Sequence, residues 1–136
     1  MQNRLRYLLC RIFPLMLLAG SAHAVSIEAW HAAVEPDNVQ RVNISCGTNF
    51  LDPREIVVKK DVPLELVIRT QGSSPDQSLT IQLPGSVLEN IIGRLPRLIR
   101  VAPNVLGSFT LQCRTPGVSE DPKTLTKKRG ILTIIP

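Results

Sequence analysis

From about residue 41 to the end of the chain, apolar and polar residues alternate in short runs separated by proline, glycine and other turn formers. In the run 41–46, for example, Val42, Ile44 and Cys46 share one face. Alternation with a period of two is typical of a β-strand with one buried side. The pattern predicts strands at residues 41–46, 55–59, 64–69, 78–83, 97–101, 108–113 and 130–135.

The stretch after the fourth predicted strand is less regular. Residues 86–93 predict a short helix that Ser86 caps and Gly93 ends. Its buried side chains would be Val87, Leu88, Ile91 and Ile92. The wider apolar stretch 87–98 is accompanied by three arginines, Arg94, Arg97 and Arg100. It is either a flap that packs on its own domain or an element for interaction with a partner.

Two other segments contain no clear period. Residues 114–129 read as a polar, basic loop, and residues 25–40 match no single element. The chain contains 11 prolines and 8 glycines, which fits many short strands joined by turns. About seven strands at fairly regular spacing, without a long helical period, predict an all-β fold of the β-sandwich type instead of an α/β fold.

The beginning of the chain has the layout of a cleavable signal peptide. Three arginines precede a short apolar run at residues 12–19, and residues 22–24 read Ala-His-Ala, which fits a signal peptidase site. The apolar run is about half of the roughly 20 residues that a membrane-spanning helix needs. We therefore expect a signal peptide at residues 1–24, a single domain at residues 25–136, and a protein that is periplasmic or secreted.

Removal of this signal changes the charge and the available chemistry. Residues 25–136 contain 13 basic and 11 acidic side chains, so the net charge falls from +5 to +2. This weak charge does not support a nucleic-acid-binding role. His31 is the one histidine left, and neither a Ser-His-Asp set nor a phosphate-binding loop is present. We therefore expect a protein that is not an enzyme.

Two cysteines remain after cleavage, because Cys10 lies in the signal. In an exported protein, Cys46 and Cys113 are expected to form a disulfide in preference to two free thiols. The alternative is that Cys113 is a reactive thiol or a ligand of a soft metal ion.

Two ordered series of residues extend over most of the domain. The first is Phe50-x-x-Pro53-x-x-Ile56-x-Val58, followed by Pro63 and Leu66. The second is Val101-x-Pro103-x-x-x-Gly107-x-Phe109-x-x-x-Cys113, followed by Pro116-Gly117 and Gly130-x-Leu132-x-Ile134. Together they resemble the cupredoxin family, including its small exported plastocyanin-like and EfeO-type members. The resemblance covers roughly residues 41–136 and implies a Greek-key β-sandwich of the cupredoxin type.

The resemblance also implies where a type-1 copper site would lie, and this sequence departs from it there. Such a site needs two imidazoles, one thiolate and a weak axial thioether. Gln77 stands in the place of the first histidine and Val118 in that of the second, while Lys128 lies where the axial methionine is usual. Cys113 alone matches the family's ligand set. We therefore expect no copper cofactor.

The same resemblance bears on the cysteines. In a cupredoxin-like sandwich the end of the strand that carries Cys46 lies at the same end of the domain as the ligand cysteine. The resemblance therefore implies that the sulfurs of Cys46 and Cys113 meet, as a disulfide requires.

The segment after Cys113 is basic, and it suggests where a partner would bind. Its basic residues are Arg114, Lys123, Lys127, Lys128 and Arg129. They form either a docking patch for an acidic partner or a solvated loop. We expect a binding or accessory protein whose unknown protein partner belongs to an exported or membrane-bound complex, with no nucleic acid bound and no membrane span after cleavage. The alternative is copper handling or electron transfer through a non-standard site that involves Cys113, Cys46 or His31.

Overall fold

A computed structural model describes residues 28–71 and 74–136, so the predicted signal peptide at residues 1–24 lies outside the described residues. The elements of the described part are β1 (Trp30–His31), β2 (Gln40–Cys46), β3 (Leu51–Asp52), β4 (Glu55–Lys59), β5 (Leu64–Arg69), β6 (Gln77–Leu83), β7 (Ser86–Ile92), β8 (Arg97–Val101), β9 (Gly107–Arg114), α1 (Pro122–Lys127) and β10 (Arg129–Ile135).

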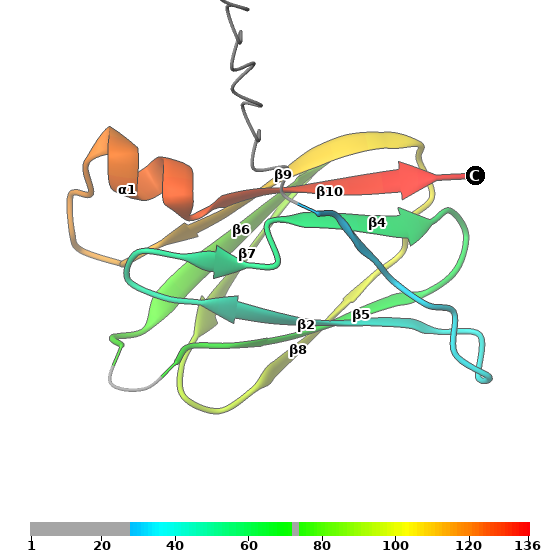
Figure 1. The fold of residues 1–136 in the computed structure, drawn as a ribbon, viewed down its shortest axis with the longest axis horizontal. Coiled ribbons are helices and arrows are strands. Elements are labelled where there is room, and N and C mark those ends of the chain that lie inside the picture. The colour runs from blue at the N-terminus through cyan, green and yellow to red at the C-terminus, as the bar shows by residue number, and fades with distance from the viewer. Residues whose placement is uncertain (1–27, 72–73) are drawn as a thin grey trace, which may run out of the picture.

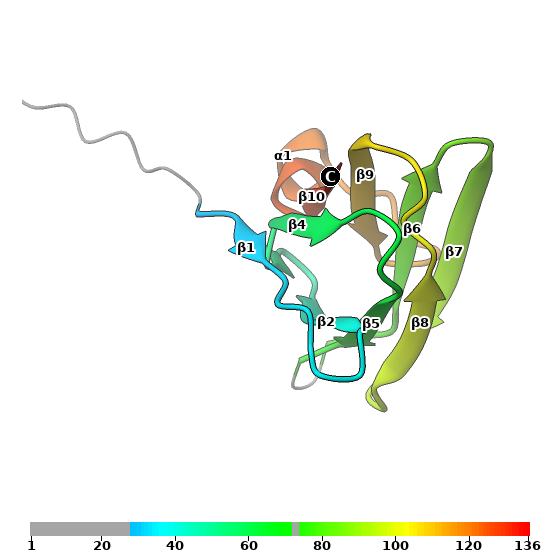
Figure 2. The ribbon, with the colours of Figure 1, turned by 90° about the vertical axis from the view of Figure 1, so that its right-hand side faces the viewer.

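The strands form two sheets that pack face to face (Figures 1 and 2). The larger sheet has the order β1-β4-β10-β9-β6-β7, and the smaller sheet has the order β3-β2-β5-β8. Both sheets are mixed, because β4 pairs in parallel with β10 and β2 pairs in parallel with β5, while most other pairs are antiparallel. The short helix α1 lies at the end of the sandwich where β10 begins (Figure 1).

The core lies between the sheets and consists of the side chains that the alternation placed on one face of each strand. In β2, for example, Val42, Ile44 and Cys46 are buried. The core side chains with no exposed surface include Ile56, Leu64, Leu66, Ile68, Leu79, Ile81, Ile92, Leu111 and Leu132. Burial of an aliphatic side chain of this size stabilises the fold by roughly 1.5–3 kcal/mol. All seven predicted strands are present, with bounds that differ by at most one residue at either end.

The predicted helix at residues 86–93 is wrong, because residues 86–92 form strand β7. β7 pairs with β6 along its whole length, from Leu83 opposite Ser86 to Gln77 opposite Ile92. The two-residue turn Pro84–Gly85 joins them, and Gly85 has a φ of 71°, which a glycine adopts without strain. Of the four side chains expected to be buried, Ile92 is buried and Leu88 partly so, whereas Val87 is 63% exposed and Ile91 49% exposed. The partner strand β6 therefore overrides the local helix signals.

The predicted loop at residues 114–129 contains the helix α1. Asp121 caps it by accepting a hydrogen bond from the backbone N–H of Thr124 at 2.8 Å, and Pro122 occupies its first turn. Both signals are readable in the sequence, but a helix of six residues is too short to show a helical period. No helix of the described residues is long and apolar enough to cross a membrane.

A disulfide between Cys46 and Cys113 joins the two sheets, as predicted. Cys46 ends β2 of the smaller sheet, and Cys113 lies near the end of β9 in the larger one. Their Cα atoms are 6.3 Å apart, and neither residue has exposed surface. Because 67 positions separate the two cysteines, the bridge restricts a large part of the unfolded chain.

Replacement of both cysteines by alanine should therefore lower the free energy of unfolding by about 4 kcal/mol in the chain-entropy model. Urea unfolding of the variant and of the wild type, with and without reductant, measures this difference. Reductant should shift the wild type and leave the variant unchanged. A thiol titration of denatured, unreduced protein provides the independent check, because two free thiols would contradict the bridge.

Candidate functional site

The four positions that correspond to copper ligands in the cupredoxin resemblance do not all meet. Gln77 begins β6, Cys113 lies in β9, and Lys128 follows the last residue of α1 directly before β10. These three residues have no exposed surface. Val118 lies in the connection between β9 and α1 and is 59% exposed. The place of the second histidine is therefore at the surface, whereas the other three positions are in the interior.

A buried ammonium group lies at the centre of the site. Nζ of Lys128 donates hydrogen bonds to Oε1 of Gln77 at 2.7 Å, to Oε1 of Glu120 at 2.5 Å and to Oγ1 of Thr115 at 3.3 Å. An ammonium group has three donors and no acceptor, so these three oxygens satisfy it completely. We call Gln77, Thr115, Glu120 and Lys128 the lysine cluster. No buried polar side-chain atom of the described residues lacks a hydrogen-bond partner.

The backbone of Lys128 is held at both of its polar groups. Its N–H donates to the carbonyl groups of Thr124 and Leu125 at 3.2 Å each, which ends α1. Its carbonyl group accepts from the N–H of Cys113 at 2.9 Å and from Nε2 of Gln112 at 3.2 Å. Lys128 is therefore fixed beside the end of β9, and its side chain enters the sandwich instead of extending into solvent.

The acceptors are oriented by further hydrogen bonds. Nε2 of Gln77 donates to the carbonyl group of Pro75 at 3.2 Å and to Oγ1 of Thr115 at 3.0 Å, so that Oε1 of Gln77 faces Lys128. Glu120 accepts from the backbone N–H of Thr115 at 3.3 Å and from its hydroxyl group at 3.1 Å. The loop after β9 therefore supplies two members of the cluster, and Thr115 connects the other three.

The lysine cluster determines the charge state of Glu120. Burial of the carboxyl group favours its neutral form, but hydrogen bonds from Lys128 and Thr115 outweigh burial and hold the pKa of Glu120 below its ordinary value. The Glu120 side chain is 7% exposed and that of Lys128 is not exposed at all. The site is therefore a closed ion pair, Lys128 with Glu120, with no vacant donor directed at a ligand.

The donors at these positions do not fit a type-1 copper centre. The Cys113 sulfur is bonded to Cys46, so it is not a thiolate, and Val118 has no donor atom. Oε1 of Gln77 already accepts from an ammonium group, and a cation at that place repels a metal ion. His31 lies in β1, exposed at the edge of the larger sheet. Within residues 28–71 and 74–136, no three His, Cys, Asp or Glu side chains gather in a group that could hold a metal ion.

The basic segment contains four exposed residues and not five. Arg114, Lys123, Lys127 and Arg129 are exposed, whereas Lys128 is completely buried. Lys128 was expected in a docking patch because a loop would leave its side chain in solvent. The end of α1 directs it inward instead, so it is removed from that patch. Binding of a partner by the other four basic residues remains a prediction.

Thr115 and Glu120 are the cluster residues that sequence reasoning missed. Neither occupies a ligand position in the cupredoxin resemblance, and a single threonine or glutamate in a polar loop carries no signal. Their role depends on a lysine that points inward. Lys128 lies just before the last strand, and Glu120 lies just before the helix cap Asp121. This spacing suggests an ion pair between them, but it does not indicate that the pair is buried.

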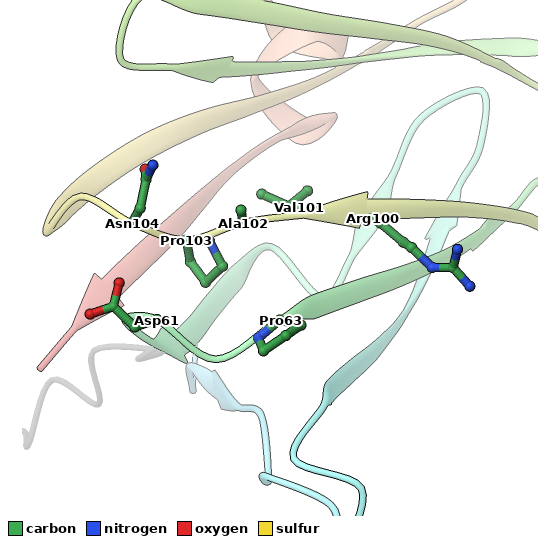
Figure 3. A pocket seen from close by; sticks show the side chains of 7 residues that line it. All are labelled: Asp61, Pro63, Arg100, Val101, Ala102, Pro103 and Asn104. Carbon is green, nitrogen blue, oxygen red and sulfur yellow. The ribbon is translucent and has the colours of Figure 1, made fainter.

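A separate hollow lies at the opposite end of the sandwich (Figure 3). It has a volume of about 490 Å³, and its lining is mainly apolar, with Pro63, Val101, Ala102 and Pro103 between Asp61 and Arg100. The N–H of Asp61 donates to the carbonyl group of Pro103 at 2.8 Å, which joins the two loops that form it. Its lining contains no histidine, cysteine, serine or threonine.

No family model matches this sequence, and no curated protein matches it either. Solved structures do. The metal-binding domain of the Cu(I)-exporting P-type ATPase CopA of Streptococcus pneumoniae D39 is 21% identical, with a TM-score of 0.58 over 82% of this chain and 99% of that one. Reduced auracyanin of Roseiflexus castenholzii is 12% identical, with a TM-score of 0.56 over 77% and 99% of the two chains. Auracyanin A of Chloroflexus aurantiacus, a "blue" copper protein, is 9% identical, with a TM-score of 0.56 over 71% and 99%.

Because the sequence identities are low, these likenesses show the fold of this chain and do not assign it a function. The chain has a cupredoxin-type all-β sandwich, as its two residue series predicted. In this cupredoxin-like fold, the positions that correspond to copper ligands hold a disulfide, an amide and a lysine of an ion pair in the interior, and Val118 at the surface.

The ion pair allows a direct test of the cluster. Lys128→Met should lower the free energy of unfolding by roughly 3 kcal/mol at neutral pH, because it leaves the largely buried carboxylate of Glu120 without its cation. The second substitution, Glu120→Gln, should restore most of this loss in Lys128→Met/Glu120→Gln. Urea unfolding measures both. Lys127→Met, at the exposed neighbouring lysine, is the matched control and should change stability by less than about 0.5 kcal/mol. Equal effects at both lysines would contradict the burial of Lys128.

The same pair predicts a dependence on pH. The pKa of folded Glu120 lies below that of an unfolded glutamate, about 4.3. The pair therefore contributes its full stability above that pH and loses it as pH falls through the lower folded pKa. The difference in unfolding free energy between the wild type and Glu120→Gln should be constant from about pH 8 to 5 and decrease in more acidic solution. A difference that grows on acidification would be the opposite sign and would reject the assignment.

Proposed function

We propose that this protein is an exported binding or accessory protein that uses the cupredoxin frame without a type-1 copper ion. The observation that carries the proposal is the buried ammonium group of Lys128. It lies 2.7 Å from Oε1 of Gln77, so two positions that would hold a metal ion are joined to each other by a hydrogen bond. The chain itself supplies the positive charge at this place.

The closed cluster supports a role that needs no electron transfer. Electron transfer requires a redox-active group, and the lysine cluster has none. Its hydrogen bonds and the disulfide instead connect the ends of β2, β6, β9 and β10. A frame rigidified in this way presents its surface with little loss of conformational entropy on binding. We accordingly propose a non-catalytic role and a protein partner, which belongs to an exported or membrane-bound complex.

Two features support export. The first is the signal peptide predicted at residues 1–24. The second is the disulfide, because such bridges persist in oxidising compartments such as the periplasm and are rare in the cytosol.

The second candidate function is copper handling through Cys113. It is favoured by the likeness to the metal-binding domain of CopA, whose crystal structure contains Cu(I). In this chain that function would require reduction of the Cys46–Cys113 bridge, which has no exposed surface. A completely buried bridge makes this the weaker of the two candidates.

The deciding experiment measures metal content and intact mass of protein purified from the periplasm, followed by addition of Cu(I) and of Cu(II). We expect a protein that begins at Val25, has the mass of the disulfide form, contains no stoichiometric copper and acquires no intense thiolate-to-copper absorption. Stoichiometric copper together with unbridged cysteines would overturn the proposal and favour the second candidate.

A matched variant tests the physical reason for the absence of copper. Gln77→His/Val118→His/Lys128→Met with Cys46→Ala restores the donor types of a type-1 site and frees the Cys113 thiol. Glu120→Gln/Lys128→Met removes the ion pair without adding a ligand. We expect thiolate-to-copper absorption from the first variant, through the freed Cys113 thiol beside position 77, and none from the second. Because position 118 lies at the surface, the first variant tests the interior donors above all. Copper binding by the second variant would show that the ion pair alone excludes the metal, and that the donor set does not matter.

A further inference from the structure

The outer edge of β7 is a long, free strand edge. β7 ends the larger sheet, and among the described residues it pairs with β6 alone. β8 ends the smaller sheet and lies on the same side of the sandwich (Figure 2). No ladder joins β7 to β8. A hollow of about 270 Å³ lies between them, with Ser86 and Leu88 on one side and Arg100 and Val101 on the other.

The opposite edges of the two sheets are much shorter. β1 and β3, which end the sheets there, have two residues each, whereas β7 has seven. Proteins protect edge strands by shortening them or by placing lysine or proline on them. β7 contains neither lysine nor proline. Its one charged residue is Glu89, whose carboxylate accepts a hydrogen bond from the Ser78 hydroxyl group at 2.9 Å. β7 is therefore an unprotected edge.

The polar backbone groups at this edge can be assigned from the register. The two-residue turn makes Leu83 and Ser86 the closing pair of the β6–β7 hairpin, so alternate residues from Ser86 bond to β6. The residues between them, Val87, Glu89 and Ile91, direct N–H and C=O to the free edge. Nη1 of Arg97 donates to the carbonyl group of Ile91 at 3.3 Å, which agrees with this assignment.

The side chains around the edge are apolar and basic. Val87 and Ile91 are 63% and 49% exposed, and Leu95 in the β7–β8 turn is 83% exposed. Arg94 and Arg97 are exposed at the same turn, and neither forms an ion pair with any described residue. Arg100 of β8 is also exposed and makes a single 3.4 Å contact with Glu65. Glu89 is the exposed acidic residue of β7, and its carboxylate accepts a hydrogen bond from the Ser78 hydroxyl group. Positive charge therefore gathers at the β7–β8 turn and on β8, beside an edge strand whose own charged residue is Glu89.

We propose that the free edge of β7 binds an extended, acidic segment of a partner protein, which adds to the larger sheet as a further strand. Backbone hydrogen bonds to Val87, Glu89 and Ile91 would hold it, its alternate apolar side chains would cover Val87 and Ile91, and its acidic residues would lie beside Arg94 and Arg97. This inference rests on the proposed function as a binding protein. It places the binding surface on β7 and not on the basic residues around α1.

The test is a titration of isotope-labelled protein, followed by the shifts of backbone amide signals. The probe is a short synthetic peptide in which valine and threonine alternate and which ends in a run of aspartates. The largest shifts should belong to Val87, Glu89 and Ile91. The substitutions Arg94→Ser/Arg97→Ser should weaken binding about fivefold, because they remove two exposed ion pairs. Ile91→Pro should abolish it, since proline removes an edge N–H and edge strands tolerate proline.

Three controls complete the test. Lys123→Ser/Lys127→Ser removes the same positive charge from α1 and should leave binding unchanged. A peptide with lysines in place of the aspartates, and one with proline at alternate positions, should not bind. Absence of shifts at saturating peptide, shifts confined to α1, or loss of binding in the Lys123/Lys127 variant would overturn the proposal. Dimerisation of the protein that Ile91→Pro abolishes would assign the edge to a second copy and would also overturn it.

These outcomes are independent of the copper test. A protein that binds copper and also binds the peptide at β7 would refute the proposed copper-free function. It would leave the proposal for the β7 edge intact. A copper-free protein that does not bind the peptide would refute only the proposal that the β7 edge is a binding surface.

Discussion

A buried ammonium group imposes strict requirements on its surroundings, and much of one end of this sandwich meets them. Removal of a lysine charge from water costs several kcal/mol unless a counter-charge and enough acceptors are present. Lys128 has both, in Glu120 and in the oxygens of Gln77 and Thr115. The loop after β9, the end of α1 and the beginnings of β6 and β10 are joined through this one group. Beside it the Cys46–Cys113 bridge joins the sheets covalently.

This arrangement separates the cupredoxin frame from cupredoxin chemistry. The structural likeness concerns the two sheets and their order, which depend on alternating core residues and not on a metal ion. Once the ligand positions hold an amide, a disulfide and a lysine, the interior of the site is closed. The parts of the molecule that remain available to other molecules are its surfaces. Among these surfaces, the β7 edge combines three features that favour binding. It has backbone groups without partners in the sheet, exposed apolar side chains, and two neighbouring arginines that form no ion pair with a described residue.

The strands could be predicted because each depends on short-range information, whereas the disulfide joins residues 67 positions apart and was expected from the number of cysteines and the cupredoxin resemblance. Residues 64–69 alternate in a way that no helix would favour, and once the predicted signal peptide with Cys10 is removed, Cys46 and Cys113 are the two cysteines left. Residues 86–92 were mispredicted because their capping and apolar signals suit a helix locally, while the ladder with β6 decides their conformation. Lys128 was placed in solvent for a similar reason. A lysine in a basic run reads as exposed, and its burial depends on Glu120 and Gln77, which lie 8 and 51 positions away.

The amino-acid sequence by itself determined the all-β class, the positions of seven strands and the loss of the copper ligand types, because these follow from local periodicity and residue identity. It favoured the pairing of Cys46 with Cys113, and the tertiary structure decided it. Only the tertiary structure decided that Lys128 fills the interior, that Thr115 and Glu120 satisfy it, and that β7 is a free edge beside three arginines. Each of these depends on which distant segments come together. The energetic balance of a buried charge or an open strand edge is set by its neighbours in space, and these are not readable from its neighbours in the chain.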